Sequence, residues 1–348
     1  MILCVIPEVL KGSYSAGNWK DVTALNLLLQ GKGLRHEVVY FDPAHREEIL
    51  NRCRPEVTDL IMHYTFWPEM LKDIRQIAPH MRLHLRAHNA EALQNWTREV
   101  TCRRMGYEKA RAIYGSMRLL WKDARCRMCA DTILGINIRD NEHYWRRLPG
   151  RACVRHLPYH SPWPRLRPQV TPVDWPRREC AILCMAGHRD MIGRSMISGF
   201  ESLAGAFVRA GAAADWRFLL SPGVFGSGRH DVASAPVVLT ERIEEPWDLL
   251  CRAKAVAVMT DLGHGTKTTV VDALAAGCHV IIHPGLAASL TKEVAAACVG
   301  CDPSDASRVK DLIARLDRPP IPQRLNEQLR DEALAVLLET LRRGPDDQ

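Results

Sequence analysis

The sequence predicts an α/β protein built from two doubly wound parallel sheets, and three observations support this class. Short apolar runs alternate with amphipathic segments along both halves of the chain. A proline-rich stretch interrupts the alternation near the middle, and an amphipathic segment ends the chain. Strands separated by helices are typical of parallel sheets. A chain of 348 residues is also long enough to form two separate cores.

The first half contains six apolar runs of strand length. The first of them lies in MILCVIPEVL, which lacks a basic leader and a small-residue cleavage site and therefore predicts a strand rather than a signal peptide. Helical patterns cover Trp19–Gln30 and the long stretch Glu91–Arg127. The expected strands are Ile2–Pro7, Arg35–Phe41, Asp59–Tyr64, Arg82–His88, Thr132–Asn137 and Cys153–Pro158.

The stretch LPYHSPWPRLRPQVTPVDWP separates the two halves. Its prolines, at positions 158, 162, 164, 168, 172 and 176, cannot continue a helix or a central strand, so we expect an extended linker. The predicted organisation is a first domain over 1–165, a linker over 166–178, a second domain over 179–322 and a terminal helix and tail over 323–348. The second domain is expected to contain strands Ala181–Ala186, Trp216–Leu220, Val237–Thr240, Ala255–Thr260 and Val280–His283.

The last predicted helix lies in LNEQLRDEALAVLLETLRR. Its apolar residues recur on one helical face, which predicts a helix that packs on a core. These residues are Leu325, Leu329, Ala333, Val336, Leu337 and Leu341.

Composition is that of a globular protein, with 47% hydrophobic and 25% charged residues. No apolar run reaches 18 residues, so we expect no transmembrane helix. Four of the twelve cysteines form two pairs with Cys-x-x-Cys spacing, Cys126/Cys129 and Cys298/Cys301. The two pairs fall in different predicted domains, so they do not supply four ligands to one zinc ion. We expect reduced thiols, no bound metal and no cofactor.

Positive charge is concentrated in one part of the first half. Residues 81–167 carry 18 Lys or Arg against 7 Asp or Glu, whereas the whole chain has a net charge of +7. Such a patch is compatible with a solvated face, a nucleic-acid surface, or a contact for anionic lipid and pyrophosphate groups. Charge alone does not choose among them.

The segment GHGTKTTVVDALAAGCHVIIHPG, residues 263–285, has the features of a phosphate site. It follows the predicted strand Ala255–Thr260, and a helix is expected to start near Thr266, so bare helical N–H groups lie at the carboxyl edge of a sheet. Gly263 and Gly265 allow close approach of the backbone. Lys267 in the first turn opposes the helix dipole unless an anion is bound there.

A P-loop does not explain this segment. When G-x-x-x-x-G-K-[ST] is aligned on Lys267 and Thr268, its two glycines fall on Thr266 and Asp261. The signature therefore fails twice, which argues against a kinase or ATPase.

The same segment resembles the donor-binding motif of group 1 (family 4) glycosyltransferases, roughly G-x-K-x-K-x-x-E-A-x-A-x-G-x-P-V-V. The resemblance implies that a lysine and the helix N-terminus hold the diphosphate of a nucleotide sugar, and that an acid in the helix bonds the ribose. Lys267 takes the first lysine place and Asp272 the acid place. His264 stands where many members carry another acid. Thr269 and His279 replace the second lysine and the proline.

Two further segments are similar to the same family. CAILCMAGHRDMIGRS has the strand–glycine–basic pattern that opens the second domain, which implies that Arg189 and Arg194 approach the diphosphate beside Gly187. RLHLRAHNAEALQNW looks like the family's His-Asn-x-Glu segment, with its histidine at His88. A strand-end histidine can bond the donor sugar or the acceptor nucleophile.

A fourth segment, IPEVLKGSYSAGNWKD, matches more loosely. It connects the first strand to the first helix, where the family has a Gly-Gly turn that faces donor and acceptor, but it contains no Gly-Gly pair. Ser15 and Asn18 can equally be the helix N-cap.

The resemblance implies a GT-B architecture, with two Rossmann-like domains facing across a cleft and a C-terminal helix returning to the first domain. It further implies glycosyl transfer with retention and without a metal. The expected catalytic residues are His88, Lys267 and Arg189. The expected donor-binding residues are Gly187, Arg194, His264, Gly265, Thr266, Thr268 and Asp272. The expected acceptor-side residues are Ser13, Gly17, Asn89 and Glu91.

The expected partners are a nucleotide-diphosphate sugar and a glycan or lipid-linked acceptor, with peripheral contact to an anionic membrane and no nucleic acid. We expect a cytoplasmic protein, or one peripheral at the inner membrane face. Three alternatives remain open: a catalytically inactive partner subunit, a sugar-nucleotide epimerase and a nucleic-acid-binding protein.

Overall fold

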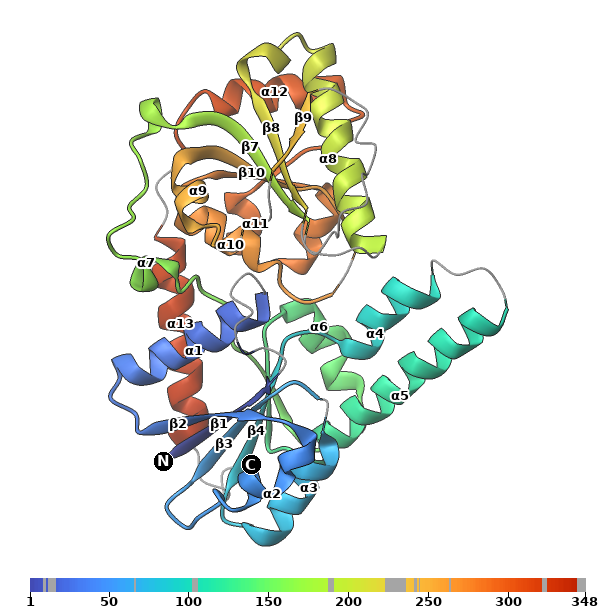
Figure 1. The fold of residues 1–348 in the computed structure, drawn as a ribbon, viewed down its shortest axis with the longest axis vertical. Helices are drawn as coiled ribbons and strands as arrows, with labels where there is room; N and C mark the ends of the chain where they lie inside the picture. The colour runs from blue at the N-terminus through green and yellow to red at the C-terminus, as the bar shows by residue number, and fades with distance from the viewer. Residues whose placement is uncertain are drawn as a thin grey trace. The chain divides into compact units, whose positions relative to one another are not determined.

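The computed structural model describes residues 1–8, 11, 17–65, 67–101, 106–186, 191–222, 236–240, 243, 245–262, 264–320 and 324–342. Contacts divide the chain into two compact units. The first is Met1–His160 with His264–Thr266 and Glu327–Gln348, and the second is Ser161–Gly263 with Lys267–Asn326. Each unit is built on one six-stranded parallel sheet (Figure 1). The predicted α/β class with two doubly wound sheets is confirmed.

The first sheet has the strand order β2-β1-β3-β4-β5-β6, and every neighbouring pair is parallel. Each predicted strand of this half is present, and its ends differ from the prediction by two residues at most. The strands are β1 (Ile2–Pro7), β2 (His36–Phe41), β3 (Asp59–His63), β4 (Arg82–Ala87), β5 (Thr132–Gly135) and β6 (Cys153–His156).

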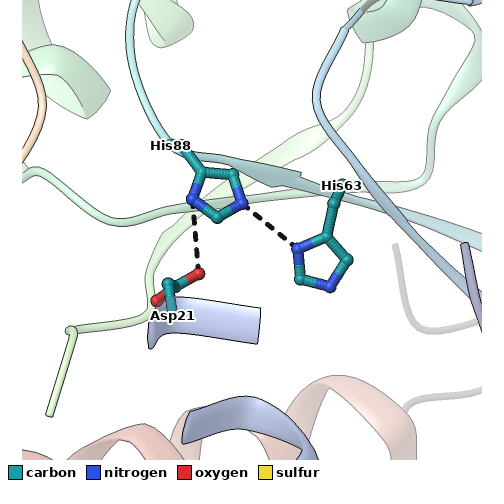
Figure 2. Close-up of side chains that lie close together, drawn as sticks. All are labelled: Asp21, His63 and His88. Atoms are coloured by element: carbon teal, nitrogen blue, oxygen red, sulfur yellow. Dashed lines mark hydrogen bonds and ion pairs between the residues drawn. The ribbon is translucent and has the colours of Figure 1, made fainter. Parts of the chain in front are cut away.

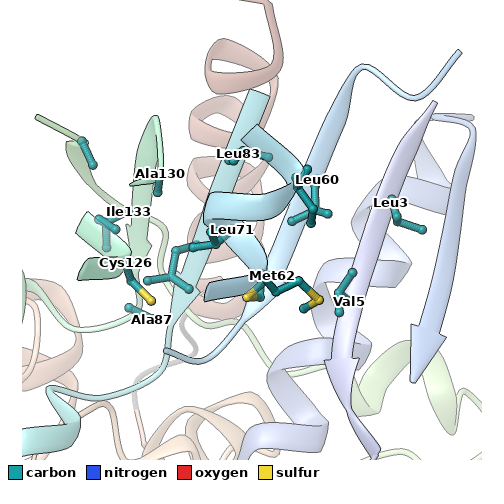
Figure 3. Packing of buried hydrophobic residues seen from close by; sticks show 14 of the residues in the cluster. Leu3, Val5, Leu60, Met62, Leu71, Leu83, Ala87, Cys126, Ala130 and Ile133 are labelled. Atoms are coloured by element: carbon teal, nitrogen blue, oxygen red, sulfur yellow. The ribbon is translucent and has the colours of Figure 1, made fainter. Parts of the chain in front are cut away.

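Alternate residues of these strands fill two separate cores. On one face, Leu60, Met62 and Leu83 pack against α3 (Pro68–Ile77) and α5 (Tyr107–Cys129), as Figure 3 shows. On the other face, strand residues such as Ile61 pack against α1 (Gly17–Gly31) and α13 (Leu325–Arg342), which contributes Ala333 and Leu337. The C-terminal helix therefore returns to the first sheet, as predicted.

The central strand β4 departs from the usual composition of a buried parallel strand, which is apolar on both faces. Its sequence, RLHLRA, alternates polar and apolar residues, and the leucines join the core with α3 and α5. Arg86 and His84 are only 2% and 1% exposed. The polar residues therefore lie inside the protein, on the face that α1 and α13 cover.

Arg82 connects the polar residues of β4 to helix α13. Its Nη2 donates to Asp59 Oδ2 at 2.8 Å and to the carbonyl oxygen of Leu341 at 2.6 Å. His84 Nε2 lies 3.0 Å from the other carboxylate oxygen of Asp59. A guanidinium on a carbonyl of the last helical turn complements the negative end of the helix dipole, so Arg82 helps to hold α13 on the first sheet.

The stretch Glu91–Arg127, where the sequence has helical patterns, is helical over most of its described residues but is not one α-helix. The described residues form α4 (Glu91–Asn95), a π-helical turn η3 (Trp96–Val100) and α5, which starts after Gly106. Gly106 has φ 145° and ψ −173°, a backbone conformation that is essentially restricted to glycine. The glycine therefore permits a break that the helical periodicity of the segment does not reveal.

The second sheet has the order β12-β11-β10-β7-β8-β9 and is also parallel throughout. Its predicted strands are present, again to within two residues. The edge strand β12 was not predicted because two residues carry no periodicity. The strands are β7 (Glu179–Ala186), β8 (Arg217–Pro222), β9 (Val237–Leu239), β10 (Ala253–Val258), β11 (His279–Ile282) and β12 (Val299–Gly300).

Helices α8 (Met191–Arg209) and α12 (Ala306–Leu316) share one core cluster with alternate residues of β7 and β10, whereas α10 (Thr268–Ala275) packs on β10 outside that cluster. Buried Arg178 donates to the carbonyl oxygens of Ala276 and Gly277, at 2.7 and 2.9 Å. Its charge thereby stabilises the carboxyl end of α10. The remaining α-helices are α2 (Arg46–Leu50), α6 (Ile138–His143), α7 (Trp163–Leu166), α9 (Trp247–Arg252) and α11 (Lys292–Ala297).

The proline-rich stretch contains two short helical elements that the sequence did not predict, α7 and the 3-10 turn η5 (Trp175–Arg177). Pro164 lies in the first turn of α7, where a missing N–H group costs no helical hydrogen bond. Residues 168–174 after it form no helix or strand.

The contact of α8 with the end of β10 requires a glycine, and this can be tested. A Cβ on Gly199 would lie 2.3 Å from the carbonyl oxygen of Met259, whereas one on Gly205 would meet only the flexible end of Arg209, at 3.5 Å. Gly199→Ala should lower the free energy of unfolding by about 2 kcal/mol through overpacking. Gly205→Ala, the matched control, should leave it unchanged or raise it by about 0.5 kcal/mol. Thermal unfolding measures both, and equal effects would contradict the packing described.

Candidate functional site

The strand orders place one topological switch point in each sheet. In the first sheet the chain leaves β1 for β2 on one side and returns to β3 on the other, and in the second sheet β7 is flanked in the same way by β8 and β10. Ligands of open α/β sheets bind at the carboxyl ends of the strands at such points. The residues at these two edges are therefore the candidate sites.

Three side chains meet at the carboxyl edge of the first sheet (Figure 2). Asp21 comes from α1, His63 ends β3 and His88 follows β4. His88 Nδ1 lies 3.5 Å from Asp21 Oδ2, and His88 Nε2 lies 3.1 Å from His63 Nδ1. All three are buried, at 2%, 0% and 4% exposure for Asp21, His63 and His88.

Arg86 holds Asp21 in place from the middle of β4. Its Nε and Nη2 donate to the two carboxylate oxygens of Asp21 at 2.8 and 2.5 Å. Its Nη1 donates to the carbonyl oxygens of Leu134 and Leu157 at 3.2 and 2.6 Å. The guanidinium is thus bonded on every nitrogen, which is the condition under which a buried ion pair is tolerated.

This pair sets the protonation of the cluster. Burial raises the pKa of a carboxyl, but the Arg86 charge and its hydrogen bonds outweigh burial and hold the pKa of Asp21 well below its usual range. Burial lowers the pKa of His88 to about 4, and burial together with His88 lowers the pKa of His63 well below its ordinary value. Both rings are therefore neutral near pH 7.

Because each neutral imidazole has one donor and one acceptor nitrogen, the donor and acceptor of each contact can be assigned. An ionised Asp21 accepts only, so the proton of His88 is assigned to Nδ1 and its Nε2 accepts from His63 Nδ1. This leaves His63 Nε2 as an acceptor, and among the described residues it has no partner. Arg86, Asp21, His88 and His63 therefore form a chain of polar contacts, in which Arg86–Asp21 and His88–His63 are hydrogen bonds and His88–Asp21 is a longer contact at 3.5 Å.

Asp21, His63 and His88 could in principle hold a metal ion, because their ligand atoms all lie within 4.8 Å of one another. Among the described residues they form the group that meets this condition. Arg86 already occupies both oxygens of Asp21 and places a positive charge beside them. That charge opposes a bound cation. The donor set therefore fits a chain of polar contacts supported by Arg86 better than a metal centre.

Tyr64 fixes the plane of the His88 ring. The two rings are stacked, with centroids 4.4 Å apart and an angle of 11° between the planes. Tyr64 has φ 72° and is the one non-glycine residue with positive φ within the described ranges. A bulky residue in this conformation is strained, so the turn after β3 is held in an unfavourable backbone state that places the ring against His88.

The two sequence segments that carry the family resemblance meet at Gly265. A Cβ there would lie 2.0 Å from Asn89 Oδ1 and 2.7 Å from the carbonyl oxygen of His88, and the residue has φ 76°. The Gly265 N–H donates to Asp140 Oδ2 at 2.8 Å, and His264 Nδ1 lies 3.3 Å from Asp140 Oδ1. Only glycine fits this approach, and the predicted donor-binding His264 is already hydrogen-bonded.

Thr266 and the acceptor-side residues lie in the same unit. Thr266 Oγ1 donates to the carbonyl oxygen of Ile136 at 3.0 Å, and Asn89 Nδ2 donates to Glu91 Oε1 at 3.3 Å. Gly17 is the first residue of α1. Ser13 lies outside the described residues, so its predicted role stays a prediction.

A group of acids beside Asn89 was not predicted. Burial and the neighbouring Asp123 carboxyl raise the pKa of Glu91 to about 7, and burial raises the pKa of Asp123 to about 6 although Tyr144 donates to it at 2.5 Å. Asp140 also contributes to the rise at Glu91. Asp123 and Asp140 come from α5 and α6, far along the chain from Glu91, so no local motif links them.

At the carboxyl edge of the second sheet, α10 begins at Thr268, two residues later than predicted, and Lys267 is its N-cap residue. The Lys267 side chain makes no capping hydrogen bond to this helix start. Ser195 Oγ of α8 lies 3.0 Å from Thr260 Oγ1 after β10, so the starts of α8 and α10 lie at neighbouring strand ends. This edge can accept an anion through helix N-termini and Lys267.

The other predicted donor residues differ in accessibility. Arg194 is exposed in the first turn of α8, whereas Asp272 is fully buried in α10. Gly187 and Arg189 lie outside the described residues. The roles predicted for all four stay predictions.

No protein-family model matches the chain, and no curated protein matches it by sequence. Its structure is similar to a sucrose-phosphate synthase from Thermosynechococcus elongatus, at 15% identity and a TM-score of 0.58, over 98% of this chain and 97% of that one. It is also similar to Anabaena HepE in complex with UDP and glucose, at 12% identity and a TM-score of 0.60, over 98% of both chains. A third match is an α,α-trehalose 6-phosphate synthase from Burkholderia multivorans, at 12% identity and a TM-score of 0.53, over 95% and 81%.

These likenesses extend over nearly the whole chain and show its fold. The protein has the GT-B architecture of two Rossmann-like units, so the resemblance to the glycosyltransferases is confirmed at the level of the fold.

The buried ion pair should dominate the stability of the first unit. Asp21→Asn keeps the shape of the side chain but leaves the Arg86 charge unpaired, so the first unit should lose about 3–5 kcal/mol. Glu69→Gln is the matched control, because Glu69 pairs with Arg125 at the surface and is 53% exposed; it should cost less than about 1 kcal/mol. Hydrogen exchange of peptides covering β4 reports unfolding of this unit. Similar protection in both variants would contradict the argument.

Glu91 should make stability depend on pH. The folded protein holds this proton more tightly than the unfolded chain, with a pKa of about 7 against 4.5. Its carboxyl therefore destabilises increasingly as pH rises from 4.5 through 7. Glu91→Gln should raise the free energy of unfolding at pH 8 by on the order of 2 kcal/mol, and by much less at pH 5. Glu142→Gln on the exposed side of α6 is the control. A benefit that does not grow with pH would show that Glu91 is not protonated as inferred.

Proposed function

We propose that the protein is a glycosyltransferase that moves a sugar from a nucleotide-diphosphate donor to a glycan or a lipid-linked acceptor. The proposal includes retention of the anomeric configuration and independence from metal. The observation that carries it is the start of α10 at the switch point of the second sheet, where Lys267 is the N-cap residue and its side chain makes no capping hydrogen bond. The GT-B fold and the neighbour that binds UDP and glucose support it.

The proposed chemistry depends on a stabilised leaving group. The bond between the anomeric carbon and the β-phosphate oxygen breaks, the acceptor oxygen bonds to that carbon, and the acceptor proton passes to the departing phosphate. Lys267, Arg189 and the N-terminus of α10 neutralise the charge that develops on the diphosphate. Preorganised positive charge of this kind contributes on the order of a few kcal/mol for each group in a site from which water is excluded.

The first unit would bind the acceptor through its strand-end residues. His88, Asn89 and Glu91 follow β4, and Glu91 can donate a proton near neutral pH because its pKa is raised to about 7. The His88 ring is engaged at both nitrogens, by Asp21 and by His63. For His88 to bond a sugar hydroxyl, Nε2 must exchange His63 for that hydroxyl, while Asp21 keeps the ring in one tautomer.

An inactive partner subunit is the second candidate, and two observations favour it. His264 replaces an acid of the family motif and is hydrogen-bonded to Asp140, and Asp272 is fully buried. Calorimetric titration with a panel of nucleotides and an RNA control separates the candidates. Binding of UDP or GDP favours transfer or epimerisation, which product analysis distinguishes. Absence of nucleotide binding favours the inactive partner, and binding of RNA alone favours a nucleic-acid protein.

Lys267→Ala should reduce sugar transfer by about 100-fold or more, because it removes about 2.7 kcal/mol or more of transition-state stabilisation. Initial rates with a UDP-sugar donor measure this effect, and titration with UDP measures the loss of affinity.

Lys292→Ala is the matched control, since Lys292 is an exposed lysine at the first position of α11 in the same unit. It should retain the wild-type rate. Near-normal transfer by the Lys267 variant would remove the role proposed for this lysine.

A further inference from the structure

Helix α5 carries a stripe of large apolar side chains in water. Tyr107, Tyr114, Trp121 and Met128 are spaced seven residues apart, so they lie along one side of the helix. Their exposed fractions are 79%, 69%, 52% and 47%. Met117 is 62% exposed beside them. A contiguous exposed patch of this kind usually marks an interaction surface.

Basic residues follow the stripe with the same spacing. Arg111, Arg118 and Arg125 stand four residues after Tyr107, Tyr114 and Trp121, so each lies one turn along from an aromatic ring. The Arg125 guanidinium lies 4.5 Å from the Trp121 ring centre. The helix carries six Lys or Arg against two acids, and one of the acids, Asp123, is buried. We call these aromatic, Met and Arg residues the α5 stripe.

The α5 stripe is not needed to build the core. The opposite side of α5 contributes the buried residues Ser116, Asp123 and Cys126, and Cys126 belongs to the core of the first unit. Figure 1 shows α5 extending with α4 beyond the edge of the first sheet. Packing of the unit therefore explains the opposite side of the helix. Apart from the ion pair of Arg125 with Glu69, it leaves the α5 stripe without a structural role.

We propose that the α5 stripe docks on the surface of an anionic lipid bilayer. Aromatic rings with a polar tip prefer the headgroup level of a membrane, and arginines beside them pair with lipid phosphates. Within the described ranges, no helix combines the length and apolar character needed to cross a bilayer, so the contact would be peripheral. A second copy of the chain fits less well, because two such stripes would place arginines against arginines.

This inference goes beyond the proposed function and does not rest on it. Docking depends on α5, whereas transfer depends on Lys267 and the edges of the two sheets. The two can therefore fail independently, and the membrane test uses no donor or acceptor.

Co-sedimentation of the full-length protein with vesicles tests the proposal. Binding should be stronger to phosphatidylcholine vesicles that contain phosphatidylglycerol than to phosphatidylcholine alone, and it should weaken as salt is added. Replacing both Tyr114 and Trp121 with alanine should lower the partition coefficient about tenfold or more. Arg111→Gln and Arg118→Gln should each lower the preference for the anionic vesicles by about fivefold.

Two matched variants control for general loss of surface residues. Ile77→Ala removes an apolar side chain that is 54% exposed on α3, and Arg151→Gln removes an exposed charge of the same unit. Both should bind vesicles as the wild type does. Far-UV circular dichroism checks that each variant is folded.

Equal binding of the stripe variants and the wild type would overturn the proposal. So would a stripe substitution that changes the sedimentation coefficient without affecting vesicle binding, because the α5 stripe would then be an interface between copies. Loss of RNA binding in the stripe variants, with no vesicle binding in the wild type, would overturn it in favour of nucleic acid.

Discussion

The buried pair of Arg86 and Asp21 is the interaction on which the first unit depends. Taking two charges out of water is costly, and the geometry offsets that cost because both carboxylate oxygens and every guanidinium nitrogen are hydrogen-bonded. The pair joins α1 to β4, and Asp21 orients the His88 ring through its contact with Nδ1. A hydrophobic pair of similar volume would hold the elements together, but it would leave the tautomer of His88 undetermined. We infer that the charges are retained for this orientation.

The two units form the polar carboxyl edge of their sheets from different chemical groups. In the first unit, side chains at the strand ends build the polar edge, and the buried Arg86 supports them from the sheet. In the second unit, backbone amides at the helix starts provide the polar edge, while Arg178 stabilises the far end of α10. An edge of imidazoles and carboxyls suits neutral hydroxyls, whereas an edge of amides and lysine suits anions. This asymmetry is the one that the proposed transfer reaction requires, with the acceptor on the first unit and the diphosphate on the second.

Local patterns were sufficient to predict the strands, since each strand carries its own apolar run. They were also sufficient to place His88 and Lys267 at strand and helix ends. The partners of His88 were not predictable, because Asp21 and His63 come from other elements and have no motif of their own. The alternation in RLHLRAH was the available signal, and it looked like a half-exposed strand. The start of a new helix after Gly106 was not predicted, because it depends on the backbone conformation of this one glycine in a sequence with helical periodicity.

The position of α13 has a consequence for how the chain matures. Its Ala333 and Leu337 complete the core that Ile2 and Cys4 of the first strand begin. During synthesis, α1 can cover its share of this face early, but the share that α13 covers stays exposed until α13 has left the ribosome. The second unit, apart from three residues, is contiguous in sequence and free to fold before then. The apolar residues of β1 that α13 covers are therefore the surface that a chaperone would have to shield in the meantime.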